Sequence, residues 1–557
     1  MRVQQQNSWM WLVPILLLAT LLGSWLLTYD AIWFDEWITY FMSNTGRIGA
    51  DTELYGVTTV EQMPVCQDVL SHQEHTILHT LCIVAIDNSW PPLFFLLLMG
   101  WDVLVGGVLY VDRIFALFIG LLGISLTYRM ASVMISRRVG LIASLLLGTL
   151  VFYTFYMHEV RGYTLYATLP ALNGWLYWRL HTRPESVGRG TRWGFVLSII
   201  ATLYTHYIGI AVVFGIGLYH VLFARPRQWW QGMRQPQDQR PPDVQHWLSL
   251  LKLIINASLT YGLWIGVLYI SLYNESLNPR SLPLSTLLWT MLRGFSNNLW
   301  WLALLAIGLS LVRWRDEALR FLWVWGLSIL AVAMVANLVA DFLFHPRHII
   351  GLLPIFVTLT AIGLVEIARR THALVLVGLL ALWVGAGAWY SLTPDFMNGL
   401  PEHVDAVPLS VMQPMVNTAE TCGTASDTFI FAWNEPDEEW AQDHMVTYYL
   451  HGTPVSGVTI SRILNEDENR HTTHLIPETI FEQSSAVRYD YFVQDAERVF
   501  VFERVEADLS DAVQEIETRL ARDGFTRCEY LNNTDLRSAA FVRAGASCEA
   551  VQQTCQP

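Results

Sequence analysis

The feature that most constrains this chain is a series of long apolar stretches. Residues 9–29 carry no charged side chain and match the ~20 apolar residues that cross a hydrocarbon core about 30 Å thick. A secretory signal peptide is the alternative, but the stretch is long and has no small-residue cleavage site before Asp30. Since 53% of the 557 residues are hydrophobic and 15% are charged, the sequence predicts a membrane protein.

Similar apolar runs follow along the first two thirds of the chain. They cover residues 114–136, 139–157, 162–178, 253–273, 294–312, 321–340, 349–365 and 373–392. The segment 193–224 is too long for one span, because its 32 residues would make a helix of roughly 48 Å. We therefore expect two short helices hinged near Thr205, His206 and Tyr207, and about eleven transmembrane helices in all. An odd number places the two ends of the chain on opposite sides.

Arginine positions predict the orientation, because cytoplasmic loops are enriched in Lys and Arg. Alternate loops hold fifteen arginines and the opposite loops hold six. We therefore expect a cytoplasmic N-terminus and an extracytoplasmic C-terminal region. Counting residues 91–111 as a further span would invert this assignment, so we expect an interfacial helix there, with Pro91 and Pro92 in its first turn.

The charge of the chain is divided between two regions. Residues 1–392 hold 24 Lys and Arg against 20 Asp and Glu, whereas residues 393–557 hold 10 against 28. We expect the first region to be the transmembrane domain and the second to be a soluble extracytoplasmic α/β domain that buries its own core. The acidic surplus disfavours nucleic acid as a partner, because no basic face remains for phosphate.

In the second region, short β-rich runs flank one helical pattern. The runs cover residues 428–433, 489–493, 498–505 and 538–544, and the helical pattern covers 509–525. Ser510 or Asp511 would cap this helix and Gly524 would end it.

All six cysteines fall on the predicted outer side. They are Cys66, Cys82, Cys422, Cys528, Cys548 and Cys555. An even number in an oxidising compartment permits disulfides, most simply Cys66 with Cys82 and two within the tail, with the connectivity left open.

Four polar clusters lie at the predicted outer face, where a buried charge usually has a partner or a task. The first is Asp35 and Glu36, which follow the first span between aromatic residues. Apolar neighbours suit such a pair to general-base catalysis or to a divalent metal. Ordinary solvated carboxylates beside a span are the alternative.

The second cluster is the turn from His158 to Tyr163. Here Arg161 could present a phosphate-binding fork anchored by Glu159, or the two charges could simply neutralise each other. The third is Arg113 at the start of the second span, which either binds a lipid phosphate or snorkels to headgroups.

The fourth cluster precedes the tenth span. Arg347 could contact a phosphate, and His345 or His348 could hold a metal, move a proton or act as interfacial hydrogen-bonding groups. His206 in the hinge extends the set. Three arginines and two acids on one face could build a single pocket for an anionic ligand. Phosphate is the ligand that would suit all three arginines.

The order of these motifs resembles a known family. It runs through Asp35-Glu36, Trp90-Pro91-Pro92, Arg113, His158-Glu159-Val160-Arg161-Gly162-Tyr163, Thr205-His206-Tyr207 and Arg347. Over roughly residues 9–366 it is similar to the GT-C superfamily, and within it to bacterial polyprenyl-phosphate-dependent glycosyltransferases of families 39 and 83, the protein O-mannosyltransferases and aminoarabinose transferases. Where many relatives have His-Pro-Pro and Gln-Glu-Ala-Arg, this chain has Trp90-Pro91-Pro92 and His158-Glu159-Val160-Arg161.

The resemblance implies a mainly α, polytopic membrane enzyme with a variable extracytoplasmic domain. It implies an inverting hexosyl- or pentosyltransferase of the bacterial plasma membrane, which moves a sugar from a polyprenyl-phosphate donor to a hydroxyl on a lipid, glycan or protein. No cofactor follows from the resemblance with certainty, and a divalent metal at Asp35 and Glu36 stays open.

The resemblance also implies roles for residues. Asp35 is similar to the family's catalytic acid, with Glu36 as its partner, and three basic residues fall where relatives place groups near the donor phosphate: Arg113, Arg161 and Arg347. We expect supporting roles for His158, Glu159, Tyr163, His206 and His348. The alternatives from other classes are a lipid or glycan flippase, which would place its binding groups near mid-membrane, and a nonenzymatic sensor.

Overall fold

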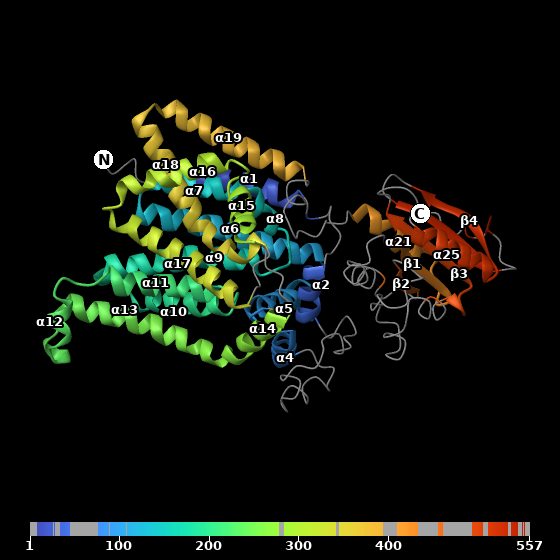
Figure 1. Ribbon diagram of the computed structural model, residues 1–557, viewed down its shortest axis with the longest axis horizontal. Coiled ribbons are helices and arrows are strands. Elements are labelled where there is room, and N and C mark those ends of the chain that lie inside the picture. The colour runs from blue at the N-terminus through green and yellow to red at the C-terminus, as the bar shows by residue number, and fades with distance from the viewer. Residues whose placement is uncertain are drawn as a thin grey trace. The chain divides into compact units, whose positions relative to one another are not determined.

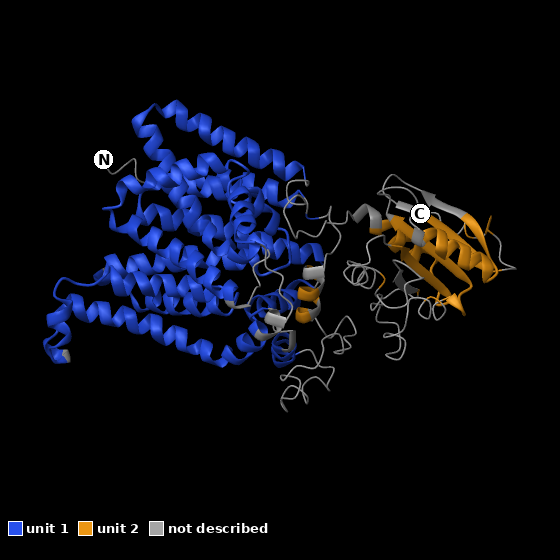
Figure 2. Ribbon diagram, in the orientation of Figure 1, with its two compact units in different colours: residues 1–27, 55–404 blue, residues 28–54, 405–557 orange. Residues whose placement is uncertain are grey.

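The chain divides into two compact units. A computed structural model describes residues 8–25, 27, 34–44, 76–87, 90–106, 109–277, 283–340, 345–393, 409–432, 450, 455–460, 489, 493–504, 511–532, 536–543, 548–549 and 551. The first unit comprises residues 1–27 and 55–404, and the second comprises residues 28–54 and 405–557 (Figure 2).

The first unit is a bundle of helices (Figure 1). Its α-helices are α1 (Leu12–Ser24), α4 (Ile77–Asp87), α5 (Leu93–Val105), α6 (Leu109–Met134), α7 (Arg137–Gly148), α8 (Val151–Tyr156), α9 (Tyr163–Thr182), α10 (Arg189–Leu203), α11 (Gly209–Leu222), α12 (Trp229–Met233), α13 (Pro242–Leu259), α14 (Ile265–Leu277), α15 (Leu284–Gly294), α16 (Trp300–Ser310), α17 (Glu317–Ala340), α18 (Leu353–Arg370) and α19 (Ala373–Leu392). Short 3-10 helices are η2 (Ser8–Trp11), η4 (Pro184–Ser186), η5 (Gln237–Gln239), η6 (Thr260–Leu263), η7 (Leu311–Arg313) and η8 (Pro346–Leu352).

Several helices are suited to a bilayer. In the described part of the chain, four are long and apolar enough to cross it: Leu109–Met134, Glu317–Leu338, Pro346–Arg370 and Ala373–Leu392. The bent pair formed by α13 with η6 and by α14, with an angle of 65°, would be a fifth. Four shorter helices are also apolar. The chain is therefore an integral membrane protein, and the number of eleven spans stays a prediction.

The helix breaks test the expected spans. The hinge in 193–224 is confirmed, because α10 ends at Leu203 and α11 begins at Gly209. The single helix expected over 139–157 is wrong, because the chain breaks between α7 and α8. The span expected over 294–312 begins later, at Trp300, since Asn297 and Asn298 have positive φ angles of 50° and 61°.

One side chain accounts for the break between α7 and α8. The Asn297 Oδ1 atom accepts the Val151 N–H at 2.9 Å, and its Nδ2 donates to the Thr149 carbonyl at 2.9 Å. Both backbone groups would otherwise be buried without a partner. Because Asn297 lies far along the chain, nothing in the local sequence of 139–157 predicts the break.

The second unit contains a mixed sheet. Its helices are α2 (Phe34–Asn44), α21 (Leu409–Cys422) and α25 (Asp511–Arg522), and its strands are β1 (Asp427–Ala432), β2 (Ser456–Ile460), β3 (Arg498–Arg504), β4 (Phe525–Asn532) and β5 (Leu536–Arg543). The strand order is β2-β1-β3-β5-β4. Strands β2, β1 and β3 are parallel, and β5 is antiparallel to both β3 and β4.

The apolar stripe of α25 packs on one face of this sheet. Val513, Ile516 and Leu520 join strand residues such as Val499 and Val501 in a single buried core. Gly524 ends the helix with φ +87°, as expected. The mainly α fold with a C-terminal α/β unit is therefore confirmed.

Two details of this unit differ from expectation. Tyr489 and Val493 adopt helical conformations, so the strand expected over 489–493 is wrong, and the residues between them lie outside the described part. Strands β2 and β4 were not predicted. Strand β4 begins at Phe525, inside the expected helical pattern, because Gly524 reverses the chain there.

The four cysteines in the described part of the chain are all disulfide-bonded. Cys528 and Cys548 form a disulfide, with Cα atoms 5.5 Å apart. Cys82 and Cys422 each take part in a disulfide of their own. Cys66 and Cys555 lie outside the described residues, so the expected pairing of Cys66 with Cys82 stays a prediction.

A close approach of α16 and α18 provides a test of the bundle. A Cβ atom at Gly363 would lie 1.8 Å from the Ala306 carbonyl oxygen, so Gly363→Ala must push the two helices apart. Overpacking of this kind costs about 1–3 kcal/mol. We expect a lower melting temperature in detergent. The matched change Gly378→Ala, where no atom lies within 4 Å, should leave the melting temperature unchanged or raise it. Equal melting temperatures for the two variants would contradict this packing.

Candidate functional site

Three breaks in the helices of the first unit carry most of the predicted site residues. Arg161 lies in the turn before α9, His206 lies in the hinge between α10 and α11, and Arg347 and His348 lie in η8. A histidine side chain satisfies the backbone at two of the breaks. His206 Nδ1 accepts the Ile208 N–H and His345 Nδ1 accepts the Arg347 N–H, each at 3.1 Å. In a region with little water, a helix can be interrupted only if side chains such as these bind the backbone N–H groups that the break leaves unpaired.

Trp90, just before α5, lies at the centre of these breaks. The Arg161 guanidinium carbon lies 4.9 Å from the Trp90 ring centre, in cation–π contact. The same indole meets Tyr163 edge-on at 4.8 Å and His206 edge-on at 4.6 Å. A Cβ atom at Gly162 would lie 3.0 Å from the indole, so the turn before α9 packs closely on it.

The remaining contacts extend the group to η8. The Arg347 guanidinium carbon lies 5.6 Å from the Tyr163 ring centre. His206 stacks on Tyr166 at 4.5 Å and lies 6.3 Å from the His348 ring. We call the following residues the arginine–aromatic cluster: Trp90, Arg161, Tyr163, Tyr166, His206, Arg347 and His348.

The electrostatics of the cluster favour an anion. The side chains of Arg161 and Arg347 are 4% and 7% exposed, so two permanent positive charges lie among aromatic rings. Because the His206 Nδ1 accepts the Ile208 N–H, the imidazole is neutral and its proton lies on Nε2, which can donate to a ligand.

Two further predicted residues lie in the turn that leads into the cluster. His158 is buried, with its ring edge-on to Phe155 at 5.1 Å, and Phe155 contacts Tyr156, which contacts Tyr163 at 4.9 Å. Glu159 is also buried, and its carbonyl oxygen accepts the Arg161 N–H at 2.8 Å. The turn is thus a tightly packed support for Arg161.

Arg113 lies near the start of α6, which packs along α9. Its side chain is buried, and its Nη1 donates to the Leu27 carbonyl at 2.9 Å. This burial disfavours the alternative in which Arg113 simply extends to lipid headgroups. Its role at a phosphate stays a prediction.

The two predicted carboxylates lie in α2, in the second unit. Glu36 is fully buried, whereas the side chain of Asp35 lies outside the described residues. The meeting of these carboxylates with the arginines therefore stays a prediction. The described residues contain no group of three or more His, Cys, Asp or Glu side chains that could hold a metal.

Sequence reasoning missed two members of the cluster. Trp90 was visible only as a departure from the motif of the relatives, and its contact with Arg161 joins segments 71 positions apart. Tyr166 follows Tyr163 by three residues on α9, which puts both rings on one helix face. That spacing was the signal available for it.

Comparisons with known proteins agree with this architecture. No protein-family model matches the sequence, and no curated protein is similar to it. The solved structures that are similar to this chain include two of ArnT from Cupriavidus metallidurans, which align over almost the whole length of both chains. The apo structure has a TM-score of 0.55 at 12% identity and covers 96% of this chain and 98% of its own. The structure bound to undecaprenyl phosphate has a TM-score of 0.55 at 13% identity, with coverage of 97% and 99%. At such low identity the similarity shows the fold alone, and this chain shares the fold of these ArnT structures.

Proposed function

We propose that this chain is a membrane glycosyltransferase that moves a sugar from a polyprenyl-phosphate donor to an acceptor hydroxyl. The observation that carries the proposal is the arginine–aromatic cluster, in which two buried guanidinium groups and a neutral imidazole converge. The comparison with known structures also supports the proposal, because the chain shares the fold of ArnT, and one ArnT structure contains undecaprenyl phosphate.

The cluster suits the phosphate of such a donor. Guanidinium groups bind phosphate oxygens through two parallel N–H groups, and removal from water strengthens the attraction. Aromatic faces at Trp90 and Tyr163 hold the two guanidinium groups before the ligand arrives. Less ordering is then required on binding. Arg113 would complete the set of basic residues around the phosphate.

The chemical step is an inverting displacement. The acceptor oxygen attacks the anomeric carbon, and its proton passes to the Asp35 carboxylate, with Glu36 beside it. The bond between that carbon and the phosphate oxygen breaks, and the electron pair leaves with the lipid phosphate. Its growing charge is stabilised by Arg161 and Arg347 and by a hydrogen bond from His206 Nε2. A divalent metal held by Asp35 and Glu36 stays an alternative, which activity after exhaustive chelation would exclude.

The proposal includes a location. Residues 1–392 form the catalytic membrane domain, and residues 393–557 form an extracytoplasmic domain. The fifteen arginines of alternate loops favour a cytoplasmic N-terminus, which puts the arginine–aromatic cluster at the outer face of a bacterial plasma membrane. The acceptor hydroxyl belongs to a lipid, a glycan or a protein.

The arginines provide the first test. Arg161→Gln and Arg347→Gln should each lower the rate of sugar transfer by about 10²- to 10³-fold, because each removes a group that stabilises the leaving phosphate. Release of undecaprenyl phosphate from a panel of undecaprenyl-phosphate sugars would be measured with the purified chain. Arg129→Gln is the control, since the Arg129 guanidinium also contacts an aromatic ring, that of Trp175 at 5.5 Å. Arg129 lies on α6 about 24 Å from Arg113, the α6 residue expected near the phosphate. Movement of the lipid across vesicles with no transfer of any sugar would favour a flippase.

Asp35 provides the second test. Asp35→Asn should lower transfer by about 10²- to 10⁴-fold, because an amide cannot accept the proton of the acceptor. Binding of undecaprenyl phosphate, measured by native mass spectrometry, should persist, since the charges at Arg161 and Arg347 are intact. Normal turnover of this variant would remove Asp35 from the role of base.

Trp90 provides the third test. Trp90→Leu removes the cation–π contact that orients Arg161, and a contact of ~1–2 kcal/mol corresponds to a 5- to 30-fold rise in the KM for the donor. Trp175→Leu is the matched control, because its ring holds Arg129 and Arg179 instead. An unchanged KM in Trp90→Leu would show that Arg161 is positioned without it.

A further inference from the structure

A second polar site lies at the end of α9 opposite Tyr163. A hollow of about 580 Å³ opens there between the last turn of α9, the end of α11 and the first turns of α13. Since α9 has 20 residues, it separates this hollow from the arginine–aromatic cluster by about 30 Å. The hollow therefore plays no part in the chemistry proposed above, and what it binds is a separate question.

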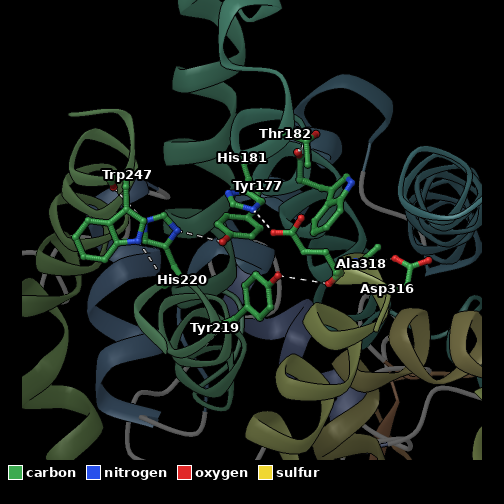
Figure 3. A network of polar contacts seen from close by, with 10 residues as sticks. Tyr177, His181, Thr182, Tyr219, His220, Trp247, Asp316 and Ala318 are labelled. Carbon is green, nitrogen blue, oxygen red and sulfur yellow. Dashed lines mark hydrogen bonds and ion pairs between the residues drawn. The ribbon is translucent and has the colours of Figure 1, made fainter. Parts of the chain in front are cut away.

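The inner wall of the hollow is held rigid by hydrogen bonds (Figure 3). His220 accepts from the Tyr177 hydroxyl through Nδ1 at 3.1 Å and donates through Nε2 to the Trp247 carbonyl at 3.0 Å. Trp247 Nε1 donates back to the His220 carbonyl at 3.0 Å. His181 pairs with Glu317 at 2.9 Å. These contacts join α9, α11, α13 and α17, so the hollow is formed before any ligand arrives.

The lining of the hollow favours a positive charge. Of the described residues that line it, none is Arg or Lys, and two are the acids Glu185 and Asp243. One Asp243 oxygen accepts the Val244 N–H at 2.9 Å, which leaves the other for a ligand. Helices α9 and α11 end here with partial negative charge at their C-termini, whereas α13 begins here and has the acid Asp243 in its first turn.

His246 adds an acceptor to this lining. Its Nε2 atom is buried and has no hydrogen-bond partner in the described part of the chain. A buried polar atom of this kind is costly unless a ligand or water meets it. Two carboxylates and an imidazole nitrogen match the three N–H donors of a primary ammonium group.

The mouth of the hollow has the opposite character. Arg225 and Arg227 are exposed on either side of Pro226, and Leu222 and Phe223 are exposed one turn earlier. The segment 222–227 therefore brings exposed apolar side chains and then positive charge, in chain order, next to the acid-lined hollow. Acyl chain, phosphate and ammonium follow one another in this order in an aminophospholipid.

We propose that this hollow binds the primary ammonium group of an aminophospholipid headgroup. Glu185, Asp243 and His246 accept its N–H groups, and Arg225 and Arg227 contact its phosphate. The arginine distribution places the site in the cytoplasmic leaflet. The proposal is independent of sugar transfer, because it concerns binding at the other end of the bundle.

Native mass spectrometry of the full chain tests this binding. Phosphatidylethanolamine and phosphatidylcholine with identical acyl chains would be added in detergent. The two lipids share the phosphate, but the choline nitrogen has no N–H to donate. We expect about tenfold tighter retention of phosphatidylethanolamine, in line with hydrogen bonds to charged groups. Equal retention would overturn the proposal.

Variants locate the site. Glu185→Gln and Asp243→Asn should each abolish the preference, and both side chains are exposed, so folding should survive. Asp238→Asn is the matched control, because Asp238 lies in η5 in the adjoining segment and does not line the hollow. A preference that persists in Glu185→Gln and Asp243→Asn, or that Asp238→Asn also abolishes, would refute this location.

A third arm distinguishes the source of the ammonium group. Phosphoethanolamine carries the same headgroup without acyl chains and should not displace the lipid at equal concentration. Displacement at equal concentration would overturn the assignment to a lipid, because the hollow would then select a soluble amine.

Discussion

A helix can be interrupted inside an apolar region only where other groups satisfy its backbone, and this constraint shapes the bundle. Asn297 binds backbone groups on both sides of the break between α7 and α8, His206 accepts the Ile208 N–H just before α11, and His345 caps η8. Two of these three breaks bring a residue of the arginine–aromatic cluster into place. The polar side chains that permit the breaks therefore also decide where charged groups can gather.

The buried guanidinium groups follow the same logic. Removing an arginine from water is expensive unless other groups replace the solvent. Trp90 and Tyr163 offer the negative faces of their rings to Arg161 and Arg347. A ring face attracts a guanidinium group from one side, so its N–H groups can still be directed toward an anionic ligand.

The sequence predicted those features that follow from a local residue pattern or from the side of the membrane on which a loop lies. The hinge at His206 followed from helix length, and the shared location of Arg161 and Arg347 followed from counting spans. The break at Leu150 could not be predicted, because it depends on Asn297, which lies 147 positions away. The place of Trp90 depends in the same way on contacts between distant segments. The start of strand β4 was predicted as helix, because Phe525 continues the apolar spacing of the helical pattern before it.

Helix α9 connects the two sites physically. Its N-terminal end, at Tyr163, lies in the arginine–aromatic cluster, and its C-terminal end, at Thr182, lies beside the hollow lined by Glu185 and Asp243. The free N–H groups of a helix start favour an anion, and the free carbonyl groups of a helix end favour a cation. The side chains at each end reinforce this polarity, since arginines gather at the start and acids line the hollow at the end. On our proposals, one helix thus presents a phosphate site and an ammonium site about 30 Å apart, toward opposite leaflets.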